Sequence, residues 1–157
     1  MSETKNQLTW INRIIVIGLL VIAIILAFAG ACHGQSNFKK HIAPGVLVFV
    51  SGSAEGVMDH LQFHGDNGDQ FWDPRVSWKN KYKNRDVSQG MTFRGKYLVF
   101  TTDGWHLMKF GRNITMFVAF TFKLGEPKKK WYLYVAEAAG YWVVNRAGFN
   151  LTYNLLK

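Results

Sequence analysis

Seven ionisable residues in this sequence have types and spacings that suit a metal-binding site. They are Glu55, Asp59, His60, His64, Asp103, His106 and Glu137. At 55–64 the two carboxylates are four positions apart, as are the two imidazoles, so on a helix each pair shares a face. Asp103 and His106 are three apart, a spacing that lets one helix offer both groups to a single ion. These oxygens and nitrogens suit a transition metal such as iron, manganese or zinc. In the alternative interpretation, the same groups lie near helix ends or form hydrogen bonds between helices.

The elements that must position these groups are apolar stretches of membrane-spanning length. Residues 14–32 form an uncharged, almost wholly apolar run of nineteen, which as a helix covers a hydrocarbon core of roughly 30 Å. Three further stretches, at 45–64, 97–122 and 131–156, have similar lengths but carry a few ionisable groups. Insertion of a lone charge at the bilayer centre costs about 2.5–3.5 kcal/mol, so these groups should be paired, bound to a metal or hydrated.

These patterns predict an all-α fold, a small polytopic membrane bundle of about four transmembrane helices in one domain covering 1–157. The spans are about 14–32, 45–64, 97–122 and 131–156, and 65–95 forms a polar, aromatic and basic loop. Pro44 suits the first turn of the second helix, because that turn does not use the missing N–H. Gly65 and Gly68 supply its stop.

A second interpretation has one N-terminal helix followed by a β-rich soluble domain. Thr115 to Phe122 is rich in β-branched and aromatic residues, and Asp103-Gly104 is a hairpin signal, so 97–122 can be read as a pair of strands. Ala29-Gly30-Ala31-Cys32 resembles a bacterial lipidation signal, which would make Cys32 a lipid anchor. The sequence leaves both questions open.

The net charge of +9 comes from basic clusters that lie between the apolar stretches. Such clusters beside spans meet anionic headgroups and set topology. The predicted contacts with headgroups or a partner combine cations and aromatic rings, at Arg75, Trp78, Lys79, Lys81, Tyr82 and Lys83. No nucleic-acid-binding motif accompanies the clusters, so nucleic acid is not an expected partner.

Lysines and arginines also predict the orientation. In a four-span arrangement, ten lie on the side of the amino terminus and six on the other side. The positive-inside rule then places both termini in the cytoplasm, and we expect an integral protein of the bacterial inner membrane.

Two features predict contacts between helices. Gly52 and Gly56 form a small-xxx-small pattern, which permits close approach of another helix. Glu55 lies inside this pattern, so an ion pair with Arg146 of the last span is one possibility.

Three sequence segments resemble segments of a group of uncharacterised bacterial polytopic membrane proteins. They are Phe71-Trp72-Asp73-Pro74, the run Ser77-Trp78-Lys79-Asn80-Lys81-Tyr82-Lys83-Asn84, and Thr102-Asp103-Gly104-Trp105-His106. In that group, a tryptophan-rich loop precedes a helix bearing the Thr-Asp-Gly-Trp-His motif. The likeness covers about residues 55–110 and implies a helical protein with several spans. It implies no activity.

Three functions are compatible with these features. The first is an accessory or structural subunit of a membrane complex, whose polar groups join helices and whose aromatic loop binds a partner subunit. The second is a metal-dependent membrane enzyme that acts on a lipid-like substrate through the histidine and carboxylate cluster. The third is a membrane-anchored or lipidated protein with an extracytoplasmic β-rich binding domain. Whether the protein is an enzyme, and whether it holds a transition metal, stays open.

Overall fold

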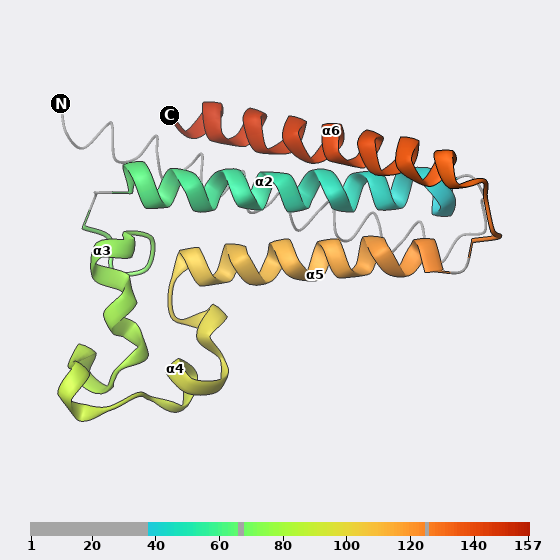
Figure 1. Cartoon of the computed structure of the whole chain (residues 1–157). Helices are drawn as coiled ribbons and strands as arrows, with labels where there is room; N and C mark the ends of the chain where they lie inside the picture. Colours follow the sequence, from blue (N-terminus) through green and yellow to red (C-terminus); the bar gives the residue numbers. More distant parts are fainter. Residues whose placement is uncertain (1–37, 66–67, 125) are drawn as a thin grey trace.

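The described chain is dominated by three long helices. The computed structural model describes residues 38–65, 68–124 and 126–157, so the predicted span at 14–32 and Cys32 lie outside the described residues. The long helices are α2 (Ala43–His64), α5 (Gly104–Leu124) and α6 (Trp131–Leu156). Figure 1 shows α2 between the other two helices, with α5 antiparallel to both. The all-α prediction is confirmed.

Residues 68–102, which we call the end region, fold into short helices at one end of the bundle (Figure 1). These are α3 (Pro74–Ser77), η2 (Trp78–Lys81), η3 (Lys83–Arg85), η4 (Val87–Gln89), α4 (Phe93–Tyr97) and η5 (Val99–Thr101). A π-helical turn, η1 (Phe38–Ile42), precedes α2. In the described parts of the chain, β pairing is limited to an isolated bridge between Tyr82 and Met91. The β-rich alternative for 40–157 is therefore wrong for these residues.

Helix α2 begins and ends where its sequence predicts. Pro44 lies in the first turn, where its missing N–H costs no helical bond. At the other end the backbone N–H of Gly65 donates to the carbonyl of Leu61 at 3.1 Å, which closes the last turn. The stretch Lys40–His64 is the single part of the described chain that is long and apolar enough to cross a membrane, with a mean hydropathy of 1.2. A buried core helix of a water-soluble protein can meet the same criterion.

Helix α5 begins at Gly104, seven residues later than the predicted span at 97–122. Tyr97 ends α4 instead, Leu98 connects it to η5, and Val99 and Phe100 belong to η5. The chain turns between η5 and α5 because Asp103 accepts a hydrogen bond from the backbone N–H of His106 at 2.9 Å, as an N-terminal cap does. Asp103-Gly104 therefore starts a helix and does not form a hairpin turn. The prediction of 131–156 for the last helix matches α6.

Helices α2 and α6 cross at three glycines. A Cβ atom placed on Gly52 would lie 1.9 Å from the carbonyl oxygen of Asn145, and one on Gly148 would lie 2.3 Å from that of Phe49. Gly56 faces the carbonyl of Phe149 in the same way, at 2.7 Å. Ser53 Oγ donates to the carbonyl of Gly148 at 3.4 Å across the contact. The predicted close approach at Gly52 and Gly56 thus occurs, and α6 is the partner helix.

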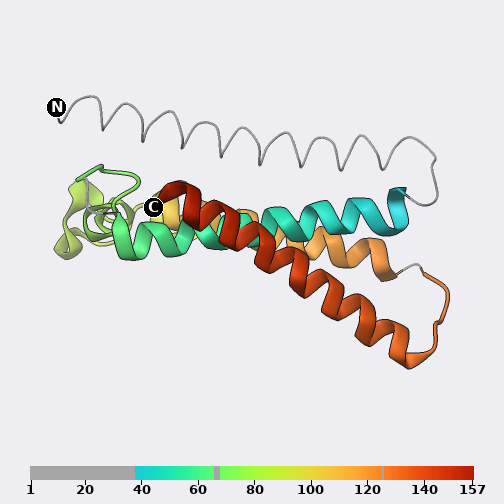
Figure 2. The same ribbon diagram turned by 90° about the horizontal axis from the view of Figure 1, so that it is seen from above.

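The apolar core divides along α2. One cluster joins Leu47 and Val48 of α2 to Ala119 of α5, with Tyr141 and Val144 of α6 packed against it. A second cluster, nearer the end region, contains Val57, Met58, Leu61 and Met108, with Trp72 and Trp105 against it. Figure 2 shows that α6 crosses α2 at an angle, so the first half of α6 diverges from the other two helices.

Candidate functional site

The start of α5 holds a buried carboxylate that binds an imidazole. Asp103 is 2% exposed. Its Oδ1 lies 2.8 Å from Nδ1 of His106 and also accepts the backbone N–H of the same residue. Its Oδ2 accepts the hydroxyl of Thr102 at 3.0 Å. Asp103 and His106, predicted to reach one ion together, contact each other directly here, and the carboxylate both caps the helix and orients the ring.

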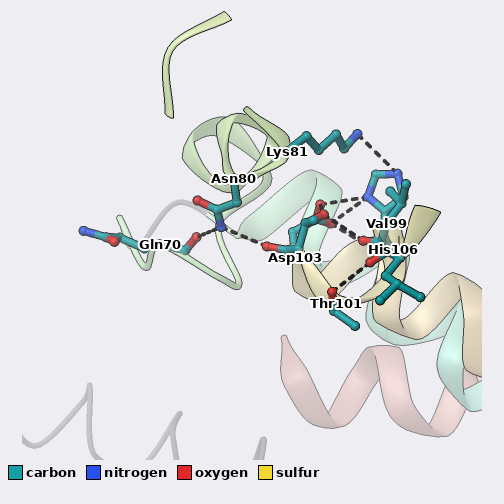
Figure 3. Close-up of polar contacts among 9 residues, drawn as sticks. Gln70, Asn80, Lys81, Val99, Thr101, Asp103 and His106 are labelled. Atoms are coloured by element: carbon teal, nitrogen blue, oxygen red, sulfur yellow. Dashed lines mark hydrogen bonds and ion pairs between the residues drawn. The ribbon is translucent and has the colours of Figure 1, made fainter. Parts of the chain in front are cut away.

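The three sequence segments that resemble the bacterial membrane proteins lie together around this carboxylate. The ring of Trp72 lies against Gly104, where an added Cβ would be 2.2 Å from a ring carbon. The backbone N–H of Gly104 donates to the carbonyl of Phe71 at 2.8 Å. The side-chain amide of Asn80 donates to the carbonyls of Gln70 and Thr102, at 2.7 and 2.9 Å (Figure 3). These contacts join the end region to the bundle.

The second nitrogen of His106 faces a lysine. Nε2 lies 3.4 Å from Nζ of Lys81. The close-up in Figure 3 shows the two side chains pointing toward each other. When Nδ1–H donates to Asp103, the neutral ring presents the lone pair of Nε2, which can accept a proton of the ammonium group. The arrangement is a carboxylate, imidazole and ammonium in series. It can bind an exchangeable proton, and it links η2 of the end region to α5.

Two of the predicted histidines form a different group with a tyrosine of α6. His64 Nε2 lies 3.1 Å from the hydroxyl of Tyr153, and the rings of His60 and His64 are 5.3 Å apart. The ring of His60 also meets that of Tyr153, at a centroid distance of 6.4 Å. These histidines join the carboxyl-terminal ends of α2 and α6.

The seven predicted ligands do not form one set in the described structure. Glu137 lies in the second turn of α6, and α6 begins at the end of the bundle opposite the start of α5 (Figure 1), which follows Asp103 in the sequence. Glu55 and Asp59 are partly buried on α2. Among residues 38–65, 68–124 and 126–157, no group of three or more histidine, cysteine or acidic side chains has the geometry to hold a metal ion. The same residues show no ion pair between Glu55 and Arg146, whose guanidinium lies over the ring of Phe149 at 5.5 Å.

The opposite end of the bundle is closed by lysines and glutamates that the sequence reasoning did not connect. Lys123 Nζ donates to Glu126 at 2.7 Å and to the carbonyl of Lys40 at 2.8 Å. Lys129 donates to Glu126 and also to Glu137, the latter at 2.6 Å. The two lysines and two glutamates therefore join η1, α5 and α6 through charged hydrogen bonds.

This network lowers the pKa of Glu126. Burial alone would raise that pKa, but the hydrogen bonds and charges of Lys123 and Lys129 outweigh burial and lower it from 4.5 to about 2. Hydrogen bonds to Glu126 and Glu137 raise the pKa of Lys129 above 10.5. Glu126 and Lys129 are therefore both charged at neutral pH.

We expect acid to destabilise the bundle through Glu126. A carboxylate with a lowered pKa in the folded state stabilises fully above its unfolded-state value, 4.5, and loses that contribution as the pH falls towards 2. The shift sets an upper limit between about 3 and 4 kcal/mol, and solvent screening of this partly exposed network lowers the actual contribution. Thermal unfolding of the purified chain in mild detergent, measured from pH 7 to pH 2.5, should show this loss, and Glu126→Gln should flatten the profile. Equal slopes for the parent and the variant would contradict the assignment.

The predicted basic and aromatic contact residues lie on α3, η2 and η3 of the end region. Trp78 donates through its indole N–H to the carbonyl of Arg75 at 3.1 Å and packs edge-on against Tyr82. Lys79 lies over the ring of Trp78 at 5.8 Å. Lys79 and Lys83 are exposed, whereas Lys81 is partly buried beside His106. One side of the end region therefore presents cations next to an exposed indole.

The end region also exposes apolar residues that the sequence reasoning missed. Phe93 and Tyr97 of α4 are 69% and 62% exposed, and their rings lie 5.2 Å apart. Val87 and Met91 are each 51% exposed. The available signal was the spacing of Phe93 and Tyr97, which places both rings on one face of a helical turn.

Fold and site together define an all-helical protein with one described helix that could cross a membrane, and with a folded basic and aromatic region at one end. Comparisons with protein-family models, with curated proteins and with solved structures find no match to this chain. The resemblance to proteins with the Thr-Asp-Gly-Trp-His motif therefore stays a prediction, and the function must be argued from the geometry.

Proposed function

We propose that this chain is a small polytopic membrane protein, in which α2, α5 and α6 cross the bilayer, and that it serves as an accessory subunit of a larger membrane complex. The observation that carries the proposal is the placement of side chains by size and polarity. Large apolar residues on α5 and α6 are 58–75% exposed, at Phe117, Phe120, Trp131, Trp142 and Val143. Such an exterior is costly in water and suits lipid.

The contacts between the helices, in contrast, are made by small and polar side chains. Ser51, Ser53, Thr115 and Thr152 are all 7% exposed or less. Ser51 Oγ donates to the backbone carbonyl of Arg112 at 3.3 Å, and the side-chain amide of Asn145 donates to the backbone carbonyl of Val48 at 3.3 Å. Helices in lipid associate through small residues, close backbone contact and hydrogen bonds of this kind.

Helix length supports the same proposal. The three helices have 22, 21 and 26 residues, which at 1.5 Å per residue gives about 33, 31 and 39 Å. The hydrocarbon core measures about 30 Å. Aromatic residues gather near both ends of the bundle, with Trp131, Tyr132 and Tyr134 at the start of α6 and Trp72 and Trp105 beside the start of α5. Tryptophan and tyrosine favour the two interfaces of a bilayer.

Three crossings would place the end region and the carboxyl terminus on one side of the membrane, and residues 125–130 on the other. A crossing by 14–32 would bring the amino terminus to the side of the end region. That side would then carry ten of the sixteen lysines and arginines assigned to the two sides, so we propose that it faces the cytoplasm.

Sided chemical labelling tests the crossings. In a chain with Cys32→Ser, a single cysteine is introduced at Ser88 of the end region or at Lys128 of the α5–α6 connection. We expect a membrane-impermeant maleimide to label the first position only in inside-out vesicles and the second only in intact cells. Labelling of both from the same side, or release of the protein by alkaline carbonate, would contradict the proposal.

The accessory role rests on the surface of the end region. Its backbone is held in place by the contacts around Asp103, yet it exposes Phe93, Tyr97 and Met91. Exposed aromatic residues on a rigid support, flanked here by Lys96, are typical of protein contact surfaces.

Purification of the tagged chain from its native membranes tests this role. We expect a defined larger complex, and we expect Phe93→Ala with Tyr97→Ala to release the chain from it. Phe117→Ala with Phe120→Ala provides a matched control, since it removes two rings from α5 and should leave the complex intact. A chain that migrates alone in mild detergent, or equal loss with both pairs, would overturn the accessory role.

A further inference from the structure

An apolar groove of about 600 Å³ lies at the end of the bundle away from the end region. Residues of all three long helices line it, among them Val48, Met116, Phe117, Phe120, Lys123 and Tyr141. Its lining residues belong to the start of α2, the second half of α5 and the first half of α6, which is the half of α6 that diverges from α2 in Figure 2. We propose that this groove binds one acyl chain of an anionic phospholipid, whose headgroup is held by Lys128 and Lys130. The inference rests on the proposed membrane location.

The position of the groove along α5 fits one leaflet of a bilayer. Its lining residues on α5 extend from Asn113, near the middle of the helix, to Lys123, one residue before its end. Ten residues of helix cover about 15 Å, which is half of a hydrocarbon core of about 30 Å. An acyl chain that enters beside Lys123 would thus reach from the interface to the bilayer centre.

The chemistry of the lining suits an acyl chain. Apolar side chains make up most of it, and two of them, Met116 and Phe120, are 43% and 60% exposed. Each methylene group transferred from water to such a surface is favourable, and a chain in the groove also meets fixed walls on three helices. The polar group at its outer end, Lys123, is already paired with Glu126 and lies over the ring of Tyr141 at 5.4 Å.

The charge beside the groove selects the headgroup. Four lysines and two glutamates lie between 123 and 137. Lys123 and Lys129 neutralise Glu126 and Glu137, which leaves the positive charge of the exposed Lys128 and Lys130. Basic positions beside a pocket between membrane helices favour phosphate-bearing, net-negative headgroups.

Lipid titration of the full chain in mild detergent, followed by native mass spectrometry, tests the proposal. We expect phosphatidylglycerol to bind about tenfold more tightly than phosphatidylcholine, because two lysines lie near the headgroup. Lys128→Gln with Lys130→Gln should abolish this preference, while Lys109→Gln with Lys157→Gln, at two exposed lysines nearer the other end, should keep it. Equal binding of the two lipids by the parent chain, or equal loss with both pairs, would overturn the assignment of the headgroup site.

A groove-filling variant tests the acyl-chain site separately. Met116→Trp should reduce the bound fraction of both lipids several-fold, whereas Leu151→Trp on the exposed surface of α6 should leave it unchanged. Equal binding by these two variants would overturn the inference. If sided labelling succeeds while lipid binding fails, the proposed membrane function survives and this inference alone falls; failed labelling removes the basis of both.

Discussion

The change Gly52→Ala is expected to force α2 and α6 apart. The added methyl carbon would lie 1.9 Å from the carbonyl oxygen of Asn145 and 2.8 Å from its carbonyl carbon. Both atoms belong to the backbone of α6, so no side-chain rotation can relieve the clash. Overpacking of this kind costs typically 1–3 kcal/mol and occasionally more, and we expect about 3 kcal/mol here.

Gly140→Ala is the matched control for this prediction. Gly140 also lies inside a long helix, but an added Cβ at that position meets nothing within 4 Å. Alanine is the better helix former, so the control should stabilise the chain by up to about 1 kcal/mol. Unfolding in mild detergent, followed by circular dichroism, compares the two variants. If Gly52→Ala is as stable as Gly140→Ala, the helices do not cross as described.

The change Asp103→Ala should release the end region from the bundle. It removes the acceptor for Thr102, for the backbone N–H of His106 and for the ring of His106, and all three bonds lie in a site where the carboxylate is 2% exposed. Loss of a helix cap costs about 0.5–2 kcal/mol, and buried groups left without partners add about 1–3 kcal/mol. We expect about 2–4 kcal/mol in total.

Hydrogen exchange over residues 68–102 locates this effect. Asp103→Ala should raise exchange throughout the end region and in the first turn of α5. Asp86→Ala provides the comparison, since Asp86 also accepts a backbone N–H, from Ser88, but lies on the exposed surface. Equal protection in the two variants would show that the carboxylate of Asp103 does not hold the end region.

The sequence could predict the long helices because their signals are local. An apolar run of sufficient length, Pro44 near its start and Gly65 at its end define α2, and the predicted stretch 131–156 coincides with α6. The start of α5 was predicted seven residues too early, since Tyr97, Leu98 and Val99 continue its apolar pattern. The helix starts later because Asp103 caps it and Gly104 contacts Trp72, and a hydropathy pattern reflects neither interaction.

The candidate site was predictable only where its members are neighbours in sequence. The spacing of Asp103 and His106 on one helix turn was sufficient to pair them. The contact with Lys81 depends on the path of the end region, and no local pattern encodes that path. Glu137 was grouped with Asp103, although the alternating direction of successive predicted helices would have placed it at the other end. Its partner there is Lys129.

The central position of α2 has a consequence for how the chain assembles. Both apolar clusters contain α2, and the small residues that admit α6 lie on it. Because α2 precedes the other two helices in the chain, it has already been synthesised when α5 and α6 pack against it. Assembly can therefore follow the order of translation. A destabilising substitution in α2 should impair the packing of both α5 and α6, whereas truncation within α6 should leave the pair α2 and α5 intact.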